Sequence, residues 1–379
     1  MNNKSLHIWM NIPSYYQNDL FNELCKKFDK FEVIYAHEQD LTRKKQGWNF
    51  DLVQNYDTKI IGKNLYISQL IPYVFQNRES THIVNGIWAE KYFFWIIILL
   101  NLFKVNFLIY SEAPVPTKRR SIFKKLLLNF IIKPISKLLI YRAKGFLAVS
   151  IFAENYFKSL RVKQEKIYRF GYFLSVRKFD FVKTNSIIIR LIFVGQLIER
   201  KGIFTLLEAI DNLVKITQNL HLNIIGTGIS EIQIKQYIQS NHLENFITLQ
   251  GAVDSENVIQ HIQKTDLLIL SSVFDGWGIV VNEALQSHVP VLISDHCGAK
   301  ELIQHEQNGL IFEAQNVESL TKQLVKFLQF SSEEKAEMKS KVIETSKKIE
   351  IPKVVDYMMD CLNHADNITL QKPSAPWLS

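Results

Sequence analysis

Residues 271–302 read SSVFDGWGIVVNEALQSHVPVLISDHCGAKEL, and this stretch decides the fold that we expect for the chain. An uninterrupted apolar run at residues 267–270 comes directly before it and predicts a buried parallel strand. The stretch itself gives a loop with two glycines, helical spacing of apolar residues over 280–285, and a second apolar strand at 290–293. Strand, loop, helix and strand in this order form the repeating unit of a parallel α/β sheet.

Two carboxylates in this stretch have a spacing that suits a ligand site. Asp275 lies on the loop, and Glu283 lies on the following helix, about 200° around the helix from the apolar Val281. The backbone amides that open the helix can bind an anion, and they belong to Gly276, Trp277, Gly278 and Ile279. Because a diphosphate needs such donors and sugar hydroxyls need carboxylates, the pattern indicates a sugar-nucleotide site. The alternative is an ordinary strand-loop-helix unit with two solvated acids.

A second loop in the same half of the chain supplies positive charge. Residues 187–194 predict a strand and residues 203–214 predict a helix, with Arg200 and Lys201 between them. Two cations beside a helix N-terminus can neutralise the charge of an anionic leaving group. A solvated Arg-Lys pair is the alternative, and the Asp275 motif in the same half of the chain favours a functional pair.

These residues resemble those of the family-four retaining glycosyltransferases, also described as glycosyl transferases group 1. The family carries E-G-F-G-x-x-x-x-E-A-x-x-x-G-x-P-V followed by G-G-x-x-E-L, and this chain follows that pattern from Asp275 to Leu302. Asp275 stands where the family has Glu. The other departures are Trp277 in place of Phe, and His288 and Cys297 in place of two glycines.

The resemblance continues in two earlier loops. The family's G-R-L-x-x-x-K-G loop binds the donor diphosphate and corresponds to residues 195–202, where Lys201 matches and Gln196 replaces Arg. The family's G-x-G triplet corresponds to Gly226 and Gly228. Glycines at such positions let the backbone turn tightly near a ligand.

The resemblance implies the GT-B arrangement, an α/β fold in which two Rossmann-like domains with parallel sheets face an interdomain cleft. We expect an acceptor-binding domain at residues 1–183 and a nucleotide-sugar-binding domain at residues 184–350. Residues 351–379 should form a helix that crosses back to the first domain, followed by a mobile tail. Apolar runs in the first half agree with a parallel sheet, at residues 7–10, 31–35, 82–84, 107–110 and 145–150.

The implied reaction moves a hexose from a UDP- or GDP-linked sugar to an acceptor hydroxyl with retained anomeric configuration. Arg200 and Lys201 would stabilise the diphosphate, and Asp275 would hold a sugar hydroxyl and orient the anomeric carbon. The acceptor would be a saccharide or a lipid-linked molecule. The resemblance implies no tightly bound cofactor, and the sequence shows no metal-ligand spacing, so we expect no bound metal.

The other site residues that the resemblance implies fall into two groups. Glu283 would bind the ribose hydroxyls, and Glu301 would brace the loop or the ribose. The full donor-binding set is Gly195, Gln196, Gly226, Gly228, Val253, Gly276, Trp277, Gly278, Ile279, Glu283 and Glu301. On the acceptor side we expect Asn11, Asp19 and Glu112, which lie near the ends of predicted strands. An N-cap, a turn or an ordinary loop acid is the alternative role for these three.

The charge of the chain is uneven, although its net value is +8. Residues 1–180 hold 28 Lys and Arg against 14 Asp and Glu, a net charge of +14, and the remaining 199 residues hold 17 against 23, a net charge of −6. Lys118 to Arg142 interleaves cations with large apolar side chains, a basic amphipathic pattern that can lie in a membrane interface. We expect this segment to contact an anionic membrane peripherally; an ordinary helix with a solvated basic face is the alternative. No nucleic-acid-binding module accompanies the charge, so nucleic acid is not an expected partner.

Residues 92–103 predict an apolar helix that is shorter than the roughly 20 residues needed to span a bilayer. We expect this helix to pack between the sheet and neighbouring helices, with a position in the membrane interface as the alternative. Three widely separated cysteines form no disulfide framework, which favours a reducing cytoplasm. The N-terminus also lacks a signal-peptide pattern.

We therefore expect a cytoplasmic enzyme, peripheral on the inner face of the plasma membrane, in bacterial cell-surface polysaccharide or lipopolysaccharide assembly. The abundance of Lys, Asn and Ile fits an AT-rich bacterial genome. Two alternatives stay open. One is another sugar-nucleotide enzyme on the same fold, such as a 2-epimerase. The other is a catalytically weak binding protein, which the departures at Asp275 and Gln196 would permit.

Overall fold

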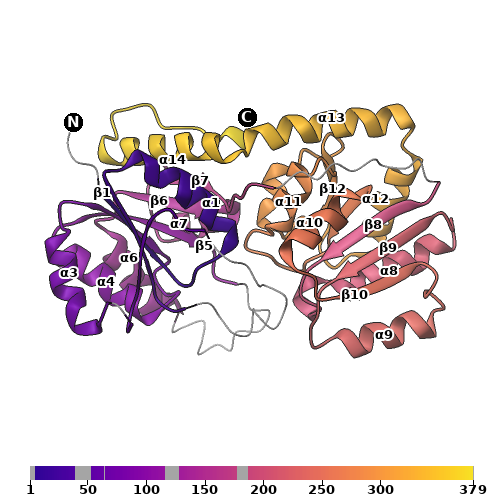
Figure 1. Ribbon diagram of the computed structural model, residues 1–379, viewed down its shortest axis with the longest axis horizontal. Coiled ribbons are helices and arrows are strands. Elements are labelled where there is room, and N and C mark those ends of the chain that lie inside the picture. The colour runs from indigo at the N-terminus through magenta and orange to yellow at the C-terminus, as the bar shows by residue number, and fades with distance from the viewer. Residues whose placement is uncertain (1–4, 39–52, 64, 116–127, 177–186, 379) are drawn as a thin grey trace. The chain divides into compact units, whose positions relative to one another are not determined.

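The computed structural model describes residues 5–38, 53–63, 65–115, 128–176 and 187–378 (Figure 1). These residues form two compact units. The described residues up to Leu174 make up the first unit together with the chain from Ile351 onward, and the described residues from Ser175 to Glu350 make up the second. The domain boundary that we predicted, between residues 183 and 184, lies outside the described residues. The interdomain cleft stays a prediction.

The first unit is built around a 7-stranded parallel sheet with the strand order β3-β2-β1-β4-β5-β6-β7. Its strands are β1 (Ser5–Met10), β2 (Lys30–Tyr35), β3 (Asp57–Ile60), β4 (Thr81–Asn85), β5 (Asn106–Glu112), β6 (Gly145–Val149) and β7 (Ile167–Phe170). The sequence predictions omit β3, whose residues DTKI lack an apolar pattern because this short strand lies at the edge of the sheet.

Helices on the first sheet share one large apolar core. The buried side chains of α3, α4, α6 and α7 belong to a single cluster with those of the strands. The helices and short helical turns of this unit are α1 (Tyr15–Leu24), η1 (Cys25–Lys27), η2 (Ile67–Gln69), α3 (Leu70–Gln76), α4 (Lys91–Leu102), η3 (Leu128–Ile132), α6 (Lys133–Ile140), α7 (Ser150–Ser159), η4 (Gln164–Lys166), α14 (Ile351–Asp366) and η7 (Pro376–Leu378). The helix predicted over residues 92–103 thus packs on the sheet, as expected, through one of its sides.

The end of the chain packs onto the first unit. In α14 the Tyr357 hydroxyl donates a hydrogen bond to the Arg169 carbonyl at 2.9 Å. Within the tail that we expected to be mobile, Trp377 is buried and lies against Phe173 with ring centroids 4.6 Å apart. The large apolar surface that an indole buries is enough to hold a terminal segment in place.

The second unit is built around a 6-stranded parallel sheet with the strand order β10-β9-β8-β11-β12-β13. Its strands are β8 (Ile189–Val194), β9 (Leu220–Ile225), β10 (Ile247–Gly251), β11 (Leu267–Leu270), β12 (Val291–Ser294) and β13 (Gly309–Phe312). Its helices and turns are η5 (Glu199–Lys201), α8 (Ile203–Val214), α9 (Glu231–Ser240), α10 (Ser255–Gln263), α11 (Val280–Gln286), η6 (Gly298–Leu302), α12 (Val317–Gln329) and α13 (Ser332–Lys348). The strand, loop, helix and strand that opened the sequence analysis are β11, its loop, α11 and β12.

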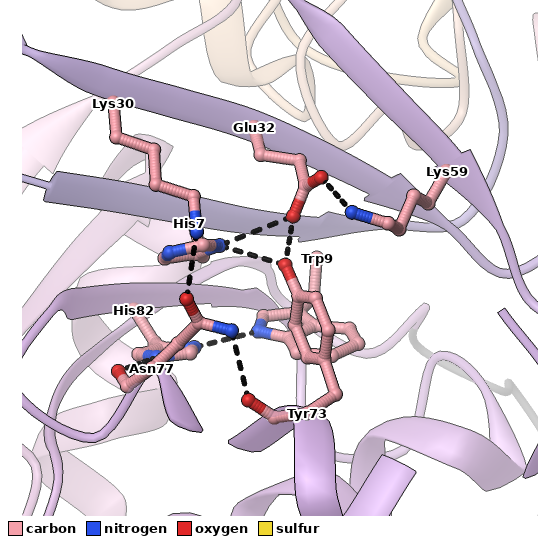
Figure 2. Close-up of polar contacts among 8 residues, drawn as sticks. All are labelled: His7, Trp9, Lys30, Glu32, Lys59, Tyr73, Asn77 and His82. Carbon is pink, nitrogen blue, oxygen red and sulfur yellow. Dashed lines mark hydrogen bonds and ion pairs between the residues drawn. The ribbon is translucent and has the colours of Figure 1, made fainter. Parts of the chain in front are cut away.

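A row of polar side chains crosses the first sheet at its amino half, and Glu32 is the acid of this row (Figure 2). Glu32 lies opposite His7 in the register of β2 and β1. Burial raises the pKa of Glu32, but hydrogen bonds from His7, Lys59 and Tyr73 together with the Lys59 charge outweigh it and lower the pKa to about 2. Glu32 is therefore an ionised carboxylate held inside the protein by its partners.

On the other side of His7 the row continues with His82, which stacks on His7 with ring centroids 5.0 Å apart. The Trp9 indole donates to His82 Nδ1 at 3.1 Å, so His82 Nε2 carries the proton and donates to the Asn77 carbonyl at 3.1 Å. Burial and the neighbouring His7 lower the pKa of His82 to about 3. His82 is thus neutral, and the row serves to join β1, β2, β4 and α3 rather than to bind a ligand at the strand ends.

Candidate functional site

The loops that we predicted to bind a sugar nucleotide begin at the point where the second sheet reverses its strand order. From β8 the chain continues to β9 on one side, while β11 pairs with β8 on the other. In parallel sheets of this kind, ligands bind outside the carboxyl ends of the two strands that flank such a reversal. The loop after β8 carries Arg200 and Lys201, and the loop after β11 carries Asp275.

Arg200 joins these two loops through its backbone and its side chain. The Arg200 carbonyl accepts a hydrogen bond from the Val273 amide at 2.9 Å. The Arg200 guanidinium donates to the Phe274 carbonyl, also at 2.9 Å. The guanidinium therefore helps to hold the loop that carries Asp275, a role that the sequence did not indicate.

Lys201 and Asp275 form an ion pair between the two loops. Lys201 Nζ lies 2.5 Å from Asp275 Oδ2, and the two side chains are 15% and 14% exposed. Gly202, which follows Lys201, has a φ of +66°, and a Cβ at this position would lie 1.9 Å from the Ser271 carbonyl oxygen. Glycine is therefore required here, because the two loop backbones approach too closely for any side chain.

Trp277 contributes its backbone to the site, whereas its side chain belongs to the core. The indole is 1% exposed and donates a hydrogen bond to Asn282 Oδ1 at 2.8 Å. The next residue, Gly278, has a φ of +98°, and a Cβ there would lie 2.6 Å from the Leu270 side chain. The part of Trp277 that stays available to a ligand is therefore its peptide groups, the groups that we predicted to bind an anion.

The two acidic residues that follow in the motif lie on segments that adjoin the Asp275 loop. Glu283 lies on α11 and is 4% exposed, and Glu301 lies half-buried on η6. The Gly298 amide, at the start of η6, donates to the Asp275 carbonyl at 3.0 Å. The structure thus brings all three acids to the same edge of the second sheet.

Two departures from the family motif have different structural consequences. Cys297 has a φ of −102°, which any residue can adopt, and its thiol is buried beside Ser294. Burial and the charge of Asp275 raise the pKa of this thiol to about 12, so it stays neutral. His288 has a φ of +60°, a conformation that costs about 1 kcal/mol for a residue with a Cβ and that glycine adopts freely.

Glycines interlock the loops after β8 and β9. Gly226 has a φ of +135°, and a Cβ there would lie 1.9 Å from the Gly195 carbonyl oxygen. A Cβ on Gly228 would lie 2.3 Å from the Leu197 carbonyl oxygen. Both positions therefore need glycine for packing between loops, whatever they contact in a ligand. Two half-buried predicted residues complete this edge, Gln196 and Val253.

The predicted acceptor residues lie at the carboxyl edge of the first sheet or on the helix after it. Asn11 follows β1, and its buried Oδ1 has no hydrogen-bond partner among the described residues. Glu112 ends β5, is exposed, and accepts a hydrogen bond from the Tyr172 hydroxyl at 2.7 Å. Asp19 is half-buried on α1, one turn into the helix.

Sequence reasoning missed a group of tyrosines at this edge. Tyr172 follows β7, and its ring centroid lies 5.0 Å from that of Tyr16 and 5.8 Å from that of Tyr110. Burial raises the pKa of Tyr172 and of Tyr110 well above its usual value, so both stay protonated. The signal in the sequence is a tyrosine directly after a predicted parallel strand, at Tyr16 near β1 and at Tyr172 after β7.

A second polar atom without a partner lies at the same edge. Ser150, the first residue of α7, follows β6 directly and is fully buried. Its Oγ has no hydrogen-bond partner in the part of the chain that the structure describes. Ser150 also has a φ of +73°, a strained conformation of the kind that is found at functional sites.

No group of three or more His, Cys, Asp or Glu side chains that could hold a metal ion occurs within the described ranges. The charged groups predicted for this edge are Lys201, Arg200 and the three acids already placed. Such an edge can bind an anion through the cations and hydroxyl groups through the carboxylates.

Comparison with known proteins gives a family match over most of the second unit. The family model described as "Glycosyl transferases group 1" matches residues 178–348. The poly(glycerol-phosphate) alpha-glucosyltransferase of Bacillus subtilis is 25% identical over 182 residues, 48% of this chain and 27% of that protein. The amylovoran biosynthesis glycosyltransferase AmsK of Erwinia amylovora is 28% identical over 147 residues, 37% of this chain and 36% of AmsK. The chain thus spans only about a quarter to a third of the length of these two relatives.

Solved structures resemble the whole chain at low sequence identity. Anabaena Alr3699/HepE in complex with UDP matches with a TM-score of 0.73 and 14% identity, covering 95% of this chain and 99% of that one. The lipopolysaccharide outer core galactosyltransferase WaaB matches with a TM-score of 0.69 and 14% identity, covering 97% and 100%. These matches confirm the predicted GT-B fold of two parallel-sheet α/β domains.

Proposed function

Since residues 178–348 form a glycosyl transferases group 1 domain within a GT-B fold, we propose that the chain is a retaining hexosyltransferase. It moves a hexose from a nucleoside-diphosphate sugar to an acceptor hydroxyl. The observation that carries this proposal is the Lys201–Asp275 ion pair at the strand reversal of the second sheet.

The ion pair holds the charges that a sugar nucleotide needs. In the free protein Asp275 neutralises Lys201, with Nζ and Oδ2 2.5 Å apart. A bound donor places its diphosphate on Lys201, and Asp275 then accepts a hydrogen bond from a sugar hydroxyl. Both groups are largely out of water, where a fixed charge stabilises a developing anion far more than it does in solvent.

In the proposed reaction the bond from the anomeric carbon to the diphosphate oxygen breaks, and a bond to the acceptor oxygen forms on the same face. The bonding electron pair leaves with the diphosphate, and the acceptor proton passes to a diphosphate oxygen. Lys201 neutralises the charge that develops on the leaving group. Arg200 holds the Asp275 loop in place through the Phe274 carbonyl. Fixing the reactants in this way accounts for much of the rate that such a site can supply.

The remaining donor contacts follow from the same edge. Glu283 binds the ribose hydroxyls from α11, and Glu301 supports them from η6. The loops after β9 and β10, with Gly226 and Val253, border the base. The donor is UDP- or GDP-linked, and the UDP complex of HepE supports a uridine donor.

The first unit supplies the acceptor site in this proposal. The unpartnered atoms Asn11 Oδ1 and Ser150 Oγ suit sugar hydroxyls, and Tyr172 offers a ring face and a hydroxyl beside Glu112. A saccharide, free or lipid-linked, presents both hydroxyls and an apolar C–H face. Names among the relatives, an amylovoran enzyme and a lipopolysaccharide enzyme, support a role in cell-surface polysaccharide assembly.

We place the enzyme in the cytoplasm, peripheral on the inner face of the plasma membrane. Among the described residues no helix is long and apolar enough to span a bilayer. Part of the predicted membrane segment, residues 118–127, lies outside the described residues, and the remainder forms η3 and α6.

Substitution of Lys201 by Ala tests the proposal. We expect kcat/KM for transfer and for donor hydrolysis to fall by about 10²–10³, because the leaving diphosphate loses its cation. Lys215→Ala is the matched control, since Lys215 is an exposed lysine of the same unit that pairs with Asp211 on α8. Wild-type rates in Lys201→Ala would reject the site.

NMR of the product reports the anomeric configuration, and an epimerised sugar formed without acceptor would indicate a 2-epimerase instead.

A further inference from the structure

Three neighbouring helices of the first unit, α3, α4 and the η3–α6 segment, turn large apolar side chains toward solvent. Their inner sides belong to one buried core with the sheet. Ordinary surface helices place polar residues on the opposite side. Here the outer side is apolar as well, at Ile71, Phe75, Trp95, Leu102, Phe130, Ile131, Ile135, Leu138 and Tyr141, which we call the outer face.

In the η3–α6 segment the two sides separate by helical spacing. Leu139 and Ile140 are buried, whereas Ile131, Ile135 and Leu138 recur every three or four residues on the exposed side. The most exposed apolar side chains of this segment are Phe130 at 74%, Leu138 at 76% and Tyr141 at 82%. Such a regular and exposed stripe forms a continuous apolar surface on one side of the helix, unlike single exposed apolar residues.

Helix α4 repeats the pattern. Phe93, Ile96, Ile97 and Leu100 are buried against the sheet. Trp95 and Leu102, seven residues apart, are exposed on the other side. The prediction that this helix packs between the sheet and other helices holds for its inner side, and the alternative, a position in a membrane interface, suits its outer side.

Side-chain contacts join the three helices into one surface. The Trp88 indole, just before α4, donates to Ser136 Oγ on α6 at 2.8 Å. The Asn101 amide on α4 donates to the Leu139 carbonyl on α6 at 2.9 Å. On the other side of α4, the rings of Phe75 and Phe103 lie 5.4 Å apart, which ties α3 to the end of α4.

Positive charge surrounds this apolar surface. Residues 128–144 contain four cations and no acid, and the cations are Lys133, Lys137, Arg142 and Lys144. Lys91 and Lys104 are exposed at the two ends of α4, and Arg78, which pairs with the exposed Glu79, lies over the Phe75 ring at 4.5 Å. Aromatic and aliphatic side chains ringed by Lys and Arg are the composition of surfaces that lie in the headgroup region of a bilayer.

We propose that the outer face binds the surface of an anionic phospholipid bilayer. The apolar side chains enter the boundary between headgroups and acyl chains, and the surrounding cations contact lipid phosphates. This extends the peripheral localisation in the proposed function by naming the surface and by assigning the main driving force to apolar insertion. It rests on the proposed function only for its biological purpose, which is access to a lipid-linked acceptor.

A bilayer fits this surface better than a second copy of the chain. A symmetric dimer through the outer face would bring identical patches together, and the cations of residues 128–144 would then face one another without acids between them. An anionic lipid surface supplies the opposite charge. In the described part of the second unit the exposed large apolar side chains are fewer and fall at three places in the chain, residues 187–188, Ile216 after α8, and Ile229 with Ile232 at α9.

The test compares two double substitutions in the full chain. Phe130→Ser with Leu138→Ser removes two of the most exposed side chains of the outer face, and Ile216→Ser with Ile232→Ser removes two of similar exposure from the second unit. Binding is measured by sedimentation with vesicles of equal parts phosphatidylglycerol and phosphatidylcholine. We expect the outer-face variant to bind at least about tenfold more weakly than wild type, and the control to match wild type.

Three outcomes would overturn the proposal: no binding of the wild-type chain to these vesicles, equal binding by the outer-face variant, or a wild-type dimer in analytical ultracentrifugation that this variant abolishes. Thermal unfolding of both variants shows that they fold. A further arm with phosphatidylcholine alone should weaken binding, because the choline ammonium then balances each lipid phosphate and the vesicle surface carries no net charge. Donor hydrolysis in solution should be unchanged in the outer-face variant. A wild-type chain that hydrolyses donor but does not bind vesicles would contradict this inference alone, whereas a chain that binds vesicles but does not hydrolyse donor would contradict the proposed function alone.

Discussion

The carboxyl edges of the two sheets differ in chemistry although the sheets share a topology. Both sheets reverse their strand order beside their first strand, between β1 and β4 in the first unit and between β8 and β11 in the second. The second edge carries an ion pair, Lys201 with Asp275, held by loops that need glycine. The first edge carries tyrosines and neutral polar atoms without partners, with Glu112 as its exposed acid.

Under the proposed function, the difference reflects the two ligands, a diphosphate at the second edge and a saccharide at the first. A diphosphate carries fixed charge, so its site needs cations at defined positions, and such cations cannot be replaced by other residue types. A saccharide is neutral and can be held by ring faces and by many combinations of hydroxyls and amides. The charged edge therefore has a sequence motif, whereas the neutral edge becomes visible only after the strands are assembled.

The largest expected effect comes from removing the charge of Asp275. Asp275→Asn leaves Lys201 without its acid and weakens the contact to the sugar, so kcat/KM should fall by about 10²–10³. Asp275→Glu restores the residue usual in the family and should stay within about tenfold of wild type. Asp211→Asn, which breaks the Lys215–Asp211 pair on α8, should leave kcat/KM unchanged. Steady-state kinetics with a nucleotide sugar measures all three, and full activity in Asp275→Asn would remove the assigned difference between the edges.

The next effect concerns stability and distinguishes the units. Folding lowers the pKa of Glu32 from 4.5 to about 2, so this residue stabilises the fold above pH 4.5, and the contribution disappears as the pH falls toward 2. Its loss in Glu32→Gln should lower the free energy of unfolding at neutral pH by about 3 kcal/mol. The stability of this variant should also depend less on pH between 4.5 and 2.

The second unit has no such acid in its described part, where the carboxylates with a lowered pKa, Glu306, Glu333 and Glu344, lie at the surface. We therefore expect acid to open the first unit before the second in hydrogen exchange followed by mass spectrometry. Glu337→Gln, an exposed change on α13, is the control. Simultaneous opening of both units in acid would show that protonation of Glu32 does not determine which unit unfolds first.

A smaller effect should appear at the neutral edge. Tyr172→Ala removes a ring face and the hydrogen bond to Glu112, and the KM for a saccharide acceptor should rise about tenfold. Tyr172→Phe keeps the ring, so its acceptor KM should lie between that of wild type and that of Tyr172→Ala. Donor hydrolysis should not change, because the diphosphate contacts belong to the second unit. Tyr66→Ala, an exposed tyrosine of the first unit, is the matched control. A defect in donor hydrolysis with an unchanged acceptor KM would contradict the division of labour.

The smallest effect tests the two departures from the family's glycines. His288→Gly should stabilise the second unit by about 0.5–1 kcal/mol, since it relieves the left-handed backbone at φ +60°. Cys297→Gly should instead destabilise it, because φ is already −102° and a buried side chain is lost. Denaturant titration measures both changes. If both substitutions changed the free energy of unfolding in the same direction, the explanation from the backbone φ angles would be contradicted.

Much of the fold was accessible from local pattern. Apolar runs such as residues 267–270 and 145–150 became β11 and β6, because a strand buried on both faces must be apolar throughout. The edge strand β3 was not predicted, because its residues are not buried on both faces and therefore show no apolar run. The burial of Trp377 was not predicted either, because its partner Phe173 is distant in the sequence.

The sequence alone determined that the second unit carries cations after β8 and acids after β11, because each loop is one continuous segment of the chain. Only the tertiary structure decided that Lys201 meets Asp275, that Arg200 braces a loop, and that the Trp277 ring is buried. It also decided that Tyr16, Tyr110 and Tyr172 meet, and that α4 and α6 form one apolar face. The physical reason is the same in each case: charge and periodicity are local properties of a chain, whereas proximity depends on strand order and register.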